Sequence, residues 1–61
     1  MEKRITATIH KVGLMQEKAP LFGCEVAGIA LLDKERAECF VTGEEEKVKA
    51  LFDECEYTEN Q

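Results

Sequence analysis

The sequence predicts a small α+β domain, in which a three-stranded, mainly antiparallel β-sheet carries one amphipathic C-terminal helix on one face. Three observations lead to this prediction. Apolar and polar residues alternate near residues 4–12 and again near 36–42, as in strands with one buried face. A continuous apolar run lies near residues 25–33. An apolar stripe with helical spacing lies near residues 43–57.

The first strand is predicted from a period of two. Ile5, Ala7 and Ile9 are separated by polar residues, and β-branched residues are frequent in this segment. Successive side chains of a strand point to opposite faces, so these three residues would share the buried face. We expect the strand to end near Val12.

The segment of residues 14–24 is predicted to form a short helical turn followed by a loop. Pro20 ends the turn, because the residue before a proline disfavours helical backbone angles. Leu21 and Phe22 then form an apolar patch, and exposed apolar patches commonly mark contact surfaces. Two interpretations stay open: the patch contacts a partner, or it packs back against one end of the sheet.

The second strand is predicted from the apolar run Val26–Leu32. Gly28 and the β-branched Ile29 favour a strand over a helix. The all-charged segment 33–36 follows and is typical of a hairpin turn. A strand that is apolar on both faces needs a cover on each side, so we expect this strand at the centre of the sheet.

The third strand is predicted to be half-buried. Ala37, Cys39 and Val41 alternate with polar residues and would face the core. Phe40 would lie on the opposite face of the same strand. An aromatic side chain there is either a single exposed ring or the anchor of an interface.

The predicted sheet needs a second cover beside the C-terminal helix. Either the segment of residues 14–22 or a second copy of the chain could supply it. A domain of this size buries only about 60% of the surface of its unfolded chain and commonly gains stability by association. We therefore expect a homodimer, with Phe40, Leu21 and Phe22 at the interface.

The C-terminal helix has a start signal and an apolar stripe. Thr42 and Glu45 have the spacing of a capping box, in which both side chains satisfy free backbone donors at a helix start. The stripe consists of Val48, Leu51, Phe52 and Cys55. We expect one domain over residues 1–61, with residues 58–61 frayed.

The charge of the chain is unevenly distributed. Residues 44–61 hold seven acidic groups against Lys47 and Lys49, which accounts for the whole net charge of −5. An acidic surface argues against nucleic-acid binding, which requires a cationic footprint. Glu44, Glu45 and Glu46 could face a basic protein partner, or could serve solubility and oppose the helix dipole.

The cellular location is predicted from two features. No apolar run resembles a signal peptide or approaches the ~20 residues of a membrane-spanning helix. The three cysteines are an odd number, whereas secreted small proteins usually pair theirs. We expect a cytoplasmic protein without a membrane partner.

The residues that could carry chemistry are few. Cys39 and Cys55 lie on predicted apolar faces and are expected to fill the core. Cys24 is expected to be the exposed thiol, and with His10 it is the candidate for a metal or thiol site. His10 is otherwise a surface histidine on the first strand. We predict no cofactor, no metal and no catalytic residue, because so small a chain has little room for a catalytic cleft.

These properties predict a cytoplasmic protein-interaction module, namely a regulator, adaptor or inhibitor that binds another protein through its apolar loop or its acidic helix face. The expected interaction residues are Leu21, Phe22, Phe40, Glu44, Glu45 and Glu46. Two alternatives stay open: a small-molecule-sensing regulatory domain with a ligand site at the dimer seam, or a metal or thiol protein using Cys24. The element order resembles a ferredoxin-like half without its last strand, as in small-molecule-sensing regulatory domains, and this resemblance concerns the fold alone.

Overall fold

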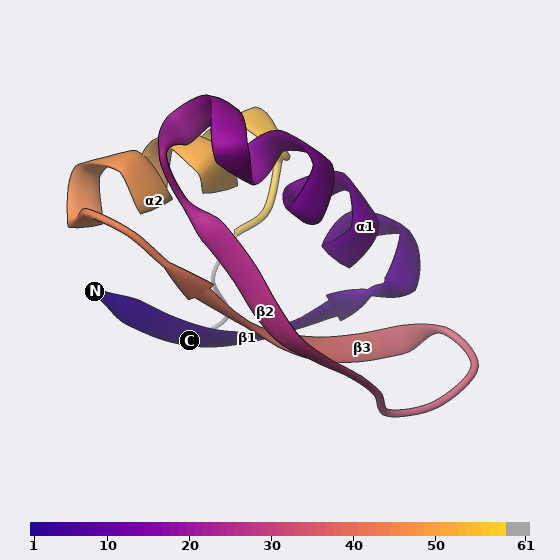
Figure 1. Cartoon of the computed structure of the whole chain (residues 1–61). Coiled ribbons are helices and arrows are strands. Elements are labelled where there is room, and N and C mark those ends of the chain that lie inside the picture. Colours follow the sequence, from indigo (N-terminus) through magenta and orange to yellow (C-terminus); the bar gives the residue numbers. More distant parts are fainter. Residues whose placement is uncertain (59–61) are drawn as a thin grey trace.

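The computed structural model describes residues 1–58 of the chain. Its elements are β1 (Glu2–Thr8), α1 (Ile9–Lys18), the short 3₁₀ helix η1 (Ala19–Phe22), β2 (Glu25–Leu31), β3 (Arg36–Thr42) and α2 (Glu45–Glu54). Figure 1 shows the sheet as one layer and the helices as a second layer above it. Of the tail predicted to fray, residues 59–61 lie outside the described part of the chain.

The sheet has the strand order β1-β3-β2, and both pairings are antiparallel. Ile5 of β1 lies opposite Cys39, and Val26 of β2 lies opposite Val41. The predicted α+β class, antiparallel sheet and C-terminal helix are confirmed. The expectation that the 25–33 strand is central was wrong: β3 is central, and β2 is an edge strand of the described sheet.

The first strand is shorter than predicted, because a helix begins inside the expected range of residues 4–12. β1 ends at Thr8, and α1 starts at Ile9. The Thr8 side chain caps α1 by accepting a hydrogen bond from the Lys11 backbone N–H at 3.1 Å. The alternation of Ile5, Ala7 and Ile9 therefore crosses a boundary between two elements.

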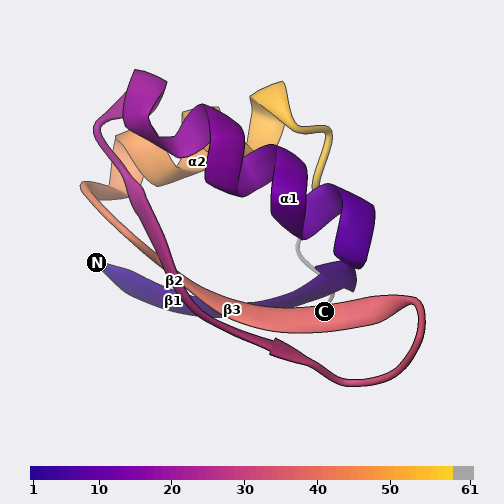
Figure 2. The ribbon, with the colours of Figure 1, turned by 45° about the vertical axis from the view of Figure 1, so that its right-hand side comes forward.

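The second cover of the sheet is α1, on the same side as α2. Val12 and Met15 of α1 and Ala19 of η1 are buried in the core. Figures 1 and 2 show both helices on one face of the sheet. The sheet therefore has one covered face and one open face, which differs from the expected strand with a cover on each side.

Two lysines of α1 hold the C-terminal end of α2. The Lys11 Nζ donates to the carbonyl oxygen of Cys55 at 2.5 Å and to that of Glu56 at 3.4 Å. The Lys18 ammonium pairs with the Glu54 carboxylate at 3.2 Å. A cation near the last carbonyls of a helix offsets the negative end of its dipole, so these contacts also orient the two helices.

The core forms between the helices and the inner face of β3. Its largest fully buried side chains are Met15, Leu51, Val41, Val48, Cys39 and Cys55. The predicted helix stripe and the predicted core face of β3 are confirmed, as are the core positions of Cys39 and Cys55. The segment expected to be a short helical turn contributes Met15 and Ala19 to this core.

The predicted capping box at the start of α2 is absent from the structure. Thr42 is the last residue of β3, and the N-cap of α2 is Glu44, whose side chain makes no capping bond. The N-cap lies two residues later than the box requires, because Thr42 still pairs with Glu2 on one side and with Glu25 on the other. The expected ion pair between Glu45 and Lys49 is present at 3.4 Å.

The end of α2 is a Schellman motif. The Glu56 backbone N–H donates to the backbone carbonyl oxygen of Asp53 at 3.1 Å, and the Tyr57 backbone N–H donates to that of Phe52 at 2.8 Å. Glu56 adopts a left-handed φ of 55° to make this turn. The rings of Tyr57 and Phe52 meet edge to face with centroids 5.0 Å apart, so the motif also adds to the core.

Candidate interaction surface

The predicted interaction residues do not form one surface. Leu21 lies on η1 and is 80% exposed, whereas Phe22 is half-buried against the core. Glu44–Glu46 are exposed at the start of α2, which packs near η1. Phe40 is half-buried in β3, on the strand face opposite the core residues of that strand. The six residues thus divide between the helical layer and the open face of the sheet.

The expected exposed thiol is buried. Cys24 lies just before β2, and its backbone N–H donates to the Ala19 carbonyl at 2.9 Å. Its Sγ is 3.6 Å from the Phe22 carbonyl oxygen. A Cβ at Gly43 would come within 2.8 Å of that Sγ, so the thiol fills the space beside the glycine. The expectation of an exposed Cys24 was wrong, because η1 folds the loop back onto α2.

His10 is exposed, as expected, but it lies in the first turn of α1 and not on a strand. It therefore sits in the helical layer, whereas Cys24 precedes β2. Within residues 1–58, no group of three or more His, Cys, Asp or Glu side chains is placed to hold a metal ion.

The two core thiols are held in their protonated form. Burial raises the pKa of Cys39, and the neighbouring Glu38 carboxylate raises it further. Burial also raises the pKa of Cys55, although the ammonium groups of Lys18 and Lys11 act in the opposite direction. The thiolate is the nucleophilic form, so these side chains act as core packing groups at neutral pH.

Exposed large apolar side chains concentrate at the end of the sheet where β2 turns into β3. They are Ile9, Ile29, Leu31 and Leu32, and we call them the hairpin-end apolar surface. Leu31 is 70% exposed and Leu32 is 50% exposed. The Ile9 N–H donates to the Glu35 carbonyl and the Leu32 N–H to the Arg36 carbonyl, both at 2.9 Å, so Ile9 and Leu32 lie at the same end of the sheet.

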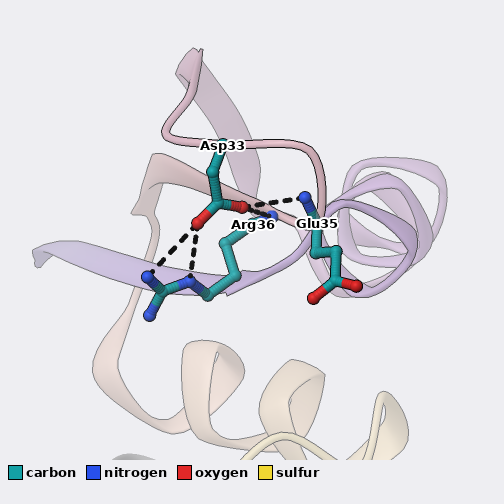
Figure 3. Close-up of polar contacts among 3 residues, drawn as sticks. All are labelled: Asp33, Glu35 and Arg36. Atoms are coloured by element: carbon teal, nitrogen blue, oxygen red, sulfur yellow. Dashed lines mark hydrogen bonds and ion pairs between the residues drawn. The ribbon is translucent and has the colours of Figure 1, made fainter.

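The turn beside this surface is rigidly bonded (Figure 3). One carboxylate oxygen of Asp33 accepts from the backbone N–H groups of Glu35 and Arg36, each at 2.8 Å. The other accepts from Nε and Nη2 of Arg36, each at 3.3 Å. These bonds to the Glu35 and Arg36 backbone, and then to the Arg36 side chain, lower the pKa of Asp33. The predicted hairpin turn is confirmed, and the Asp33 carboxylate organises it.

The two edges of the sheet differ in charge. β1 begins with Glu2, Lys3 and Arg4, whereas β2 carries no charge from Val26 to Leu31. Natural sheets usually protect an exposed edge with charged side chains, proline, bulges or a covering segment, because unpaired backbone groups recruit other strands. From Val26 to Leu31, β2 therefore lacks the charged side chains that β1 carries on its edge.

A β-bulge divides β2 into two parts. Its register with β3 shifts between Ala27 and Ala30. Gly28 has a left-handed φ of 64°, and a Cβ there would come within 3.0 Å of the Phe40 ring. Glycine is needed because it adopts this φ without a steric cost and leaves room for the ring. The half of β2 after the bulge carries Ile29 and Leu31.

The hairpin-end apolar surface was missed from the sequence, although its signal was visible. The run Val26–Leu32 by itself predicts a central strand with covers on both sides. On an edge strand, the same run indicates an exposed apolar surface, because a large part of it is not covered by neighbouring elements. The strand order, which the sequence does not state, decides between the two meanings.

Comparison with protein-family models, with curated proteins and with solved structures finds no match for this chain. No helix of the described residues is long and apolar enough to cross a membrane.

Proposed function

We propose that this chain is a small protein-interaction module that binds its partner by adding a β-strand to the edge of β2. The observation that supports this proposal is an edge strand that carries no charge from Val26 to Leu31 and whose second half leaves Ile29 and Leu31 exposed. The partner is an extended protein segment with apolar side chains, because only such a segment can use both the backbone edge and the hairpin-end apolar surface.

The energetic basis of the proposal is twofold. An added strand pairs backbone N–H and C=O groups that would otherwise bond to water, which sets the geometry of the complex. Covering Leu31 and Leu32 removes apolar surface from water at about 25 cal/mol per Å², which supplies affinity. The apolar loop at Leu21 and the acidic start of α2 stay as competing surfaces, and the experiment separates them.

The experiment is an affinity capture with three matched variants of the immobilised protein. Leu31→Lys places a charge on the hairpin-end apolar surface, and Leu21→Lys makes the same change on η1. A third variant reverses the charges of Glu44–Glu46. We expect captured proteins to be lost with Leu31→Lys and kept with the other two variants.

A second readout localises the contact. Hydrogen exchange of the β2 amides should slow when a captured partner is added, while exchange in β1 stays unchanged. Capture that survives Leu31→Lys would contradict strand addition at β2. Capture that is lost with Leu21→Lys or with the charge reversal would instead support the loop or the acidic helix.

A further inference from the structure

We infer that the strand added to β2 comes from a second copy of this chain, so that two antiparallel β2 strands join two sheets into one of six strands. This inference rests on the proposed function, because it names the partner of the same edge. It differs from the dimer expected from the sequence, which placed Phe40, Leu21 and Phe22 at the seam.

The first argument is self-complementarity. Two copies of one edge strand related by a twofold axis are antiparallel, and each strand then offers the other the same backbone donors and acceptors. A parallel pairing of two identical edges lacks this symmetry and closes no dimer. The β2 edge therefore meets the geometric requirement for its own partner.

The second argument is charge. The segment Val26–Leu32 carries no charged residue, so two copies bring no like charges together along the seam. Glu25 lies at the start of each strand, and the antiparallel arrangement places the two Glu25 side chains at opposite ends. At the other end of the strand, Asp33 is already paired with Arg36 at 3.3 Å.

The position of the seam follows from the bulge. A bulge bends and twists its strand, which opposes regular pairing across it. The regular part of the edge that also carries exposed apolar side chains is therefore Ile29–Leu31, because the Leu32 N–H already donates to the Arg36 carbonyl. A seam centred on Ala30 places the two Ala30 residues opposite each other and each Ile29 opposite a Leu31 of the other copy, so that opposed side chains share one face of the joined sheet. Large and small side chains then alternate along the seam.

The other edge does not offer the same partner. Glu2, Lys3 and Arg4 cover the first half of β1, and antiparallel pairing of two β1 strands would bury part of this charge. Lys3 and Arg4 also differ in the face of the sheet on which they lie, so both sides of that edge are charged. Association is therefore directed to β2.

The test is sedimentation velocity of the purified chain from about 5 to about 500 µM, where mass action populates a weak dimer. We expect a concentration-dependent dimer. Leu31→Lys should raise its dissociation constant at least about tenfold, because the charge would be desolvated at the seam. Leu21→Lys carries the same charge on another exposed leucine and should stay within about twofold of the parent.

Hydrogen exchange at the two ends of the concentration range identifies the seam. The outward-pointing amides of Ile29 and Leu31 should exchange more slowly at high concentration, with no change in β1. A dimer stacked through the open sheet face would leave these amides unchanged and would be weakened by Phe40→Ser; that result overturns the inference. A strict monomer at the highest concentration also overturns it, while the capture experiment then decides separately whether β2 binds another protein.

Discussion

At the scale of single residues, the structure depends on a few polar and conformational details. Asp33 bonds both backbone and side-chain donors of its turn, and Gly28 allows the bulge beside Phe40. Thr8 caps α1. The sequence predicted the turn at Asp33, because four consecutive charged residues between two apolar segments are typical of a turn. It did not predict the cap or the bulge, since each depends on where the neighbouring element ends.

The turn should become sensitive to acid through Asp33. The pKa of Asp33 is lower in the folded chain than its ordinary value of 3.8. A carboxyl with a depressed folded pKa contributes stability above its unfolded pKa and loses it as the pH falls through the folded pKa. We expect the urea midpoint of the parent to exceed that of Asp33→Asn at pH 7, and the difference to shrink below about pH 3.8.

The control for this titration is Glu35→Gln. Figure 3 shows that the Glu35 carboxylate points away from the bonds of Asp33. Its removal should leave the midpoint nearly unchanged from pH 7 to acid. A difference between the parent and Asp33→Asn that stays constant over the whole pH range would show that the carboxylate charge does not organise the turn.

At the scale of elements, prediction succeeded where several independent signals agreed. The helix stripe of Val48, Leu51, Phe52 and Cys55 repeats over two turns, and β3 combines alternation with an adjoining turn. α1 was missed because the strand-like alternation ends at Ile9, where the helix begins. Pro20 was rightly associated with a helix end, but the helix before it is much longer than a single turn.

The C-terminal turn of α2 offers a stabilising substitution. Glu56 occupies the left-handed position of the Schellman motif, where a side chain carries a steric cost that glycine avoids. We expect Glu56→Gly to raise the free energy of unfolding by about 0.5–1 kcal/mol in urea titrations. Glu56→Ala removes the same carboxylate but keeps a Cβ, so it should bring no comparable gain. Equal effects of the two variants would attribute the change to charge and not to φ.

At the scale of the whole molecule, one side of the sheet carries nearly all of the core. The helices cover the inner face of β3, whereas the outer face and the β2 edge stay open in the single chain (Figure 2). A domain of this length is expected to have a free energy of unfolding of roughly 3–9 kcal/mol. The sequence predicts association through a further surface, but only the strand order shows which surfaces of the single chain stay exposed.

The core should therefore tolerate little truncation of its buried apolar side chains. Leu51 is fully buried between the helices and the sheet, so Leu51→Ala should lower the free energy of unfolding by about 2–4 kcal/mol through the cavity it leaves. Circular dichroism during thermal and urea unfolding measures the change. Leu21→Ala removes the same atoms from an exposed site and should stay within about 0.5 kcal/mol of the parent. A melting temperature of Leu51→Ala within a few degrees of the parent would contradict this packing.

The burial of all three cysteines gives the native protein a surface without thiols. A thiol-specific dye can then react only with molecules whose core has opened. The absorbance change from this reaction therefore reports opening of the core without any introduced label. Cys24 precedes β2, Cys39 lies in β3 and Cys55 follows α2, so the order in which they become modified would show which part of the core opens first. The rate of thiol modification therefore measures how often the native core opens.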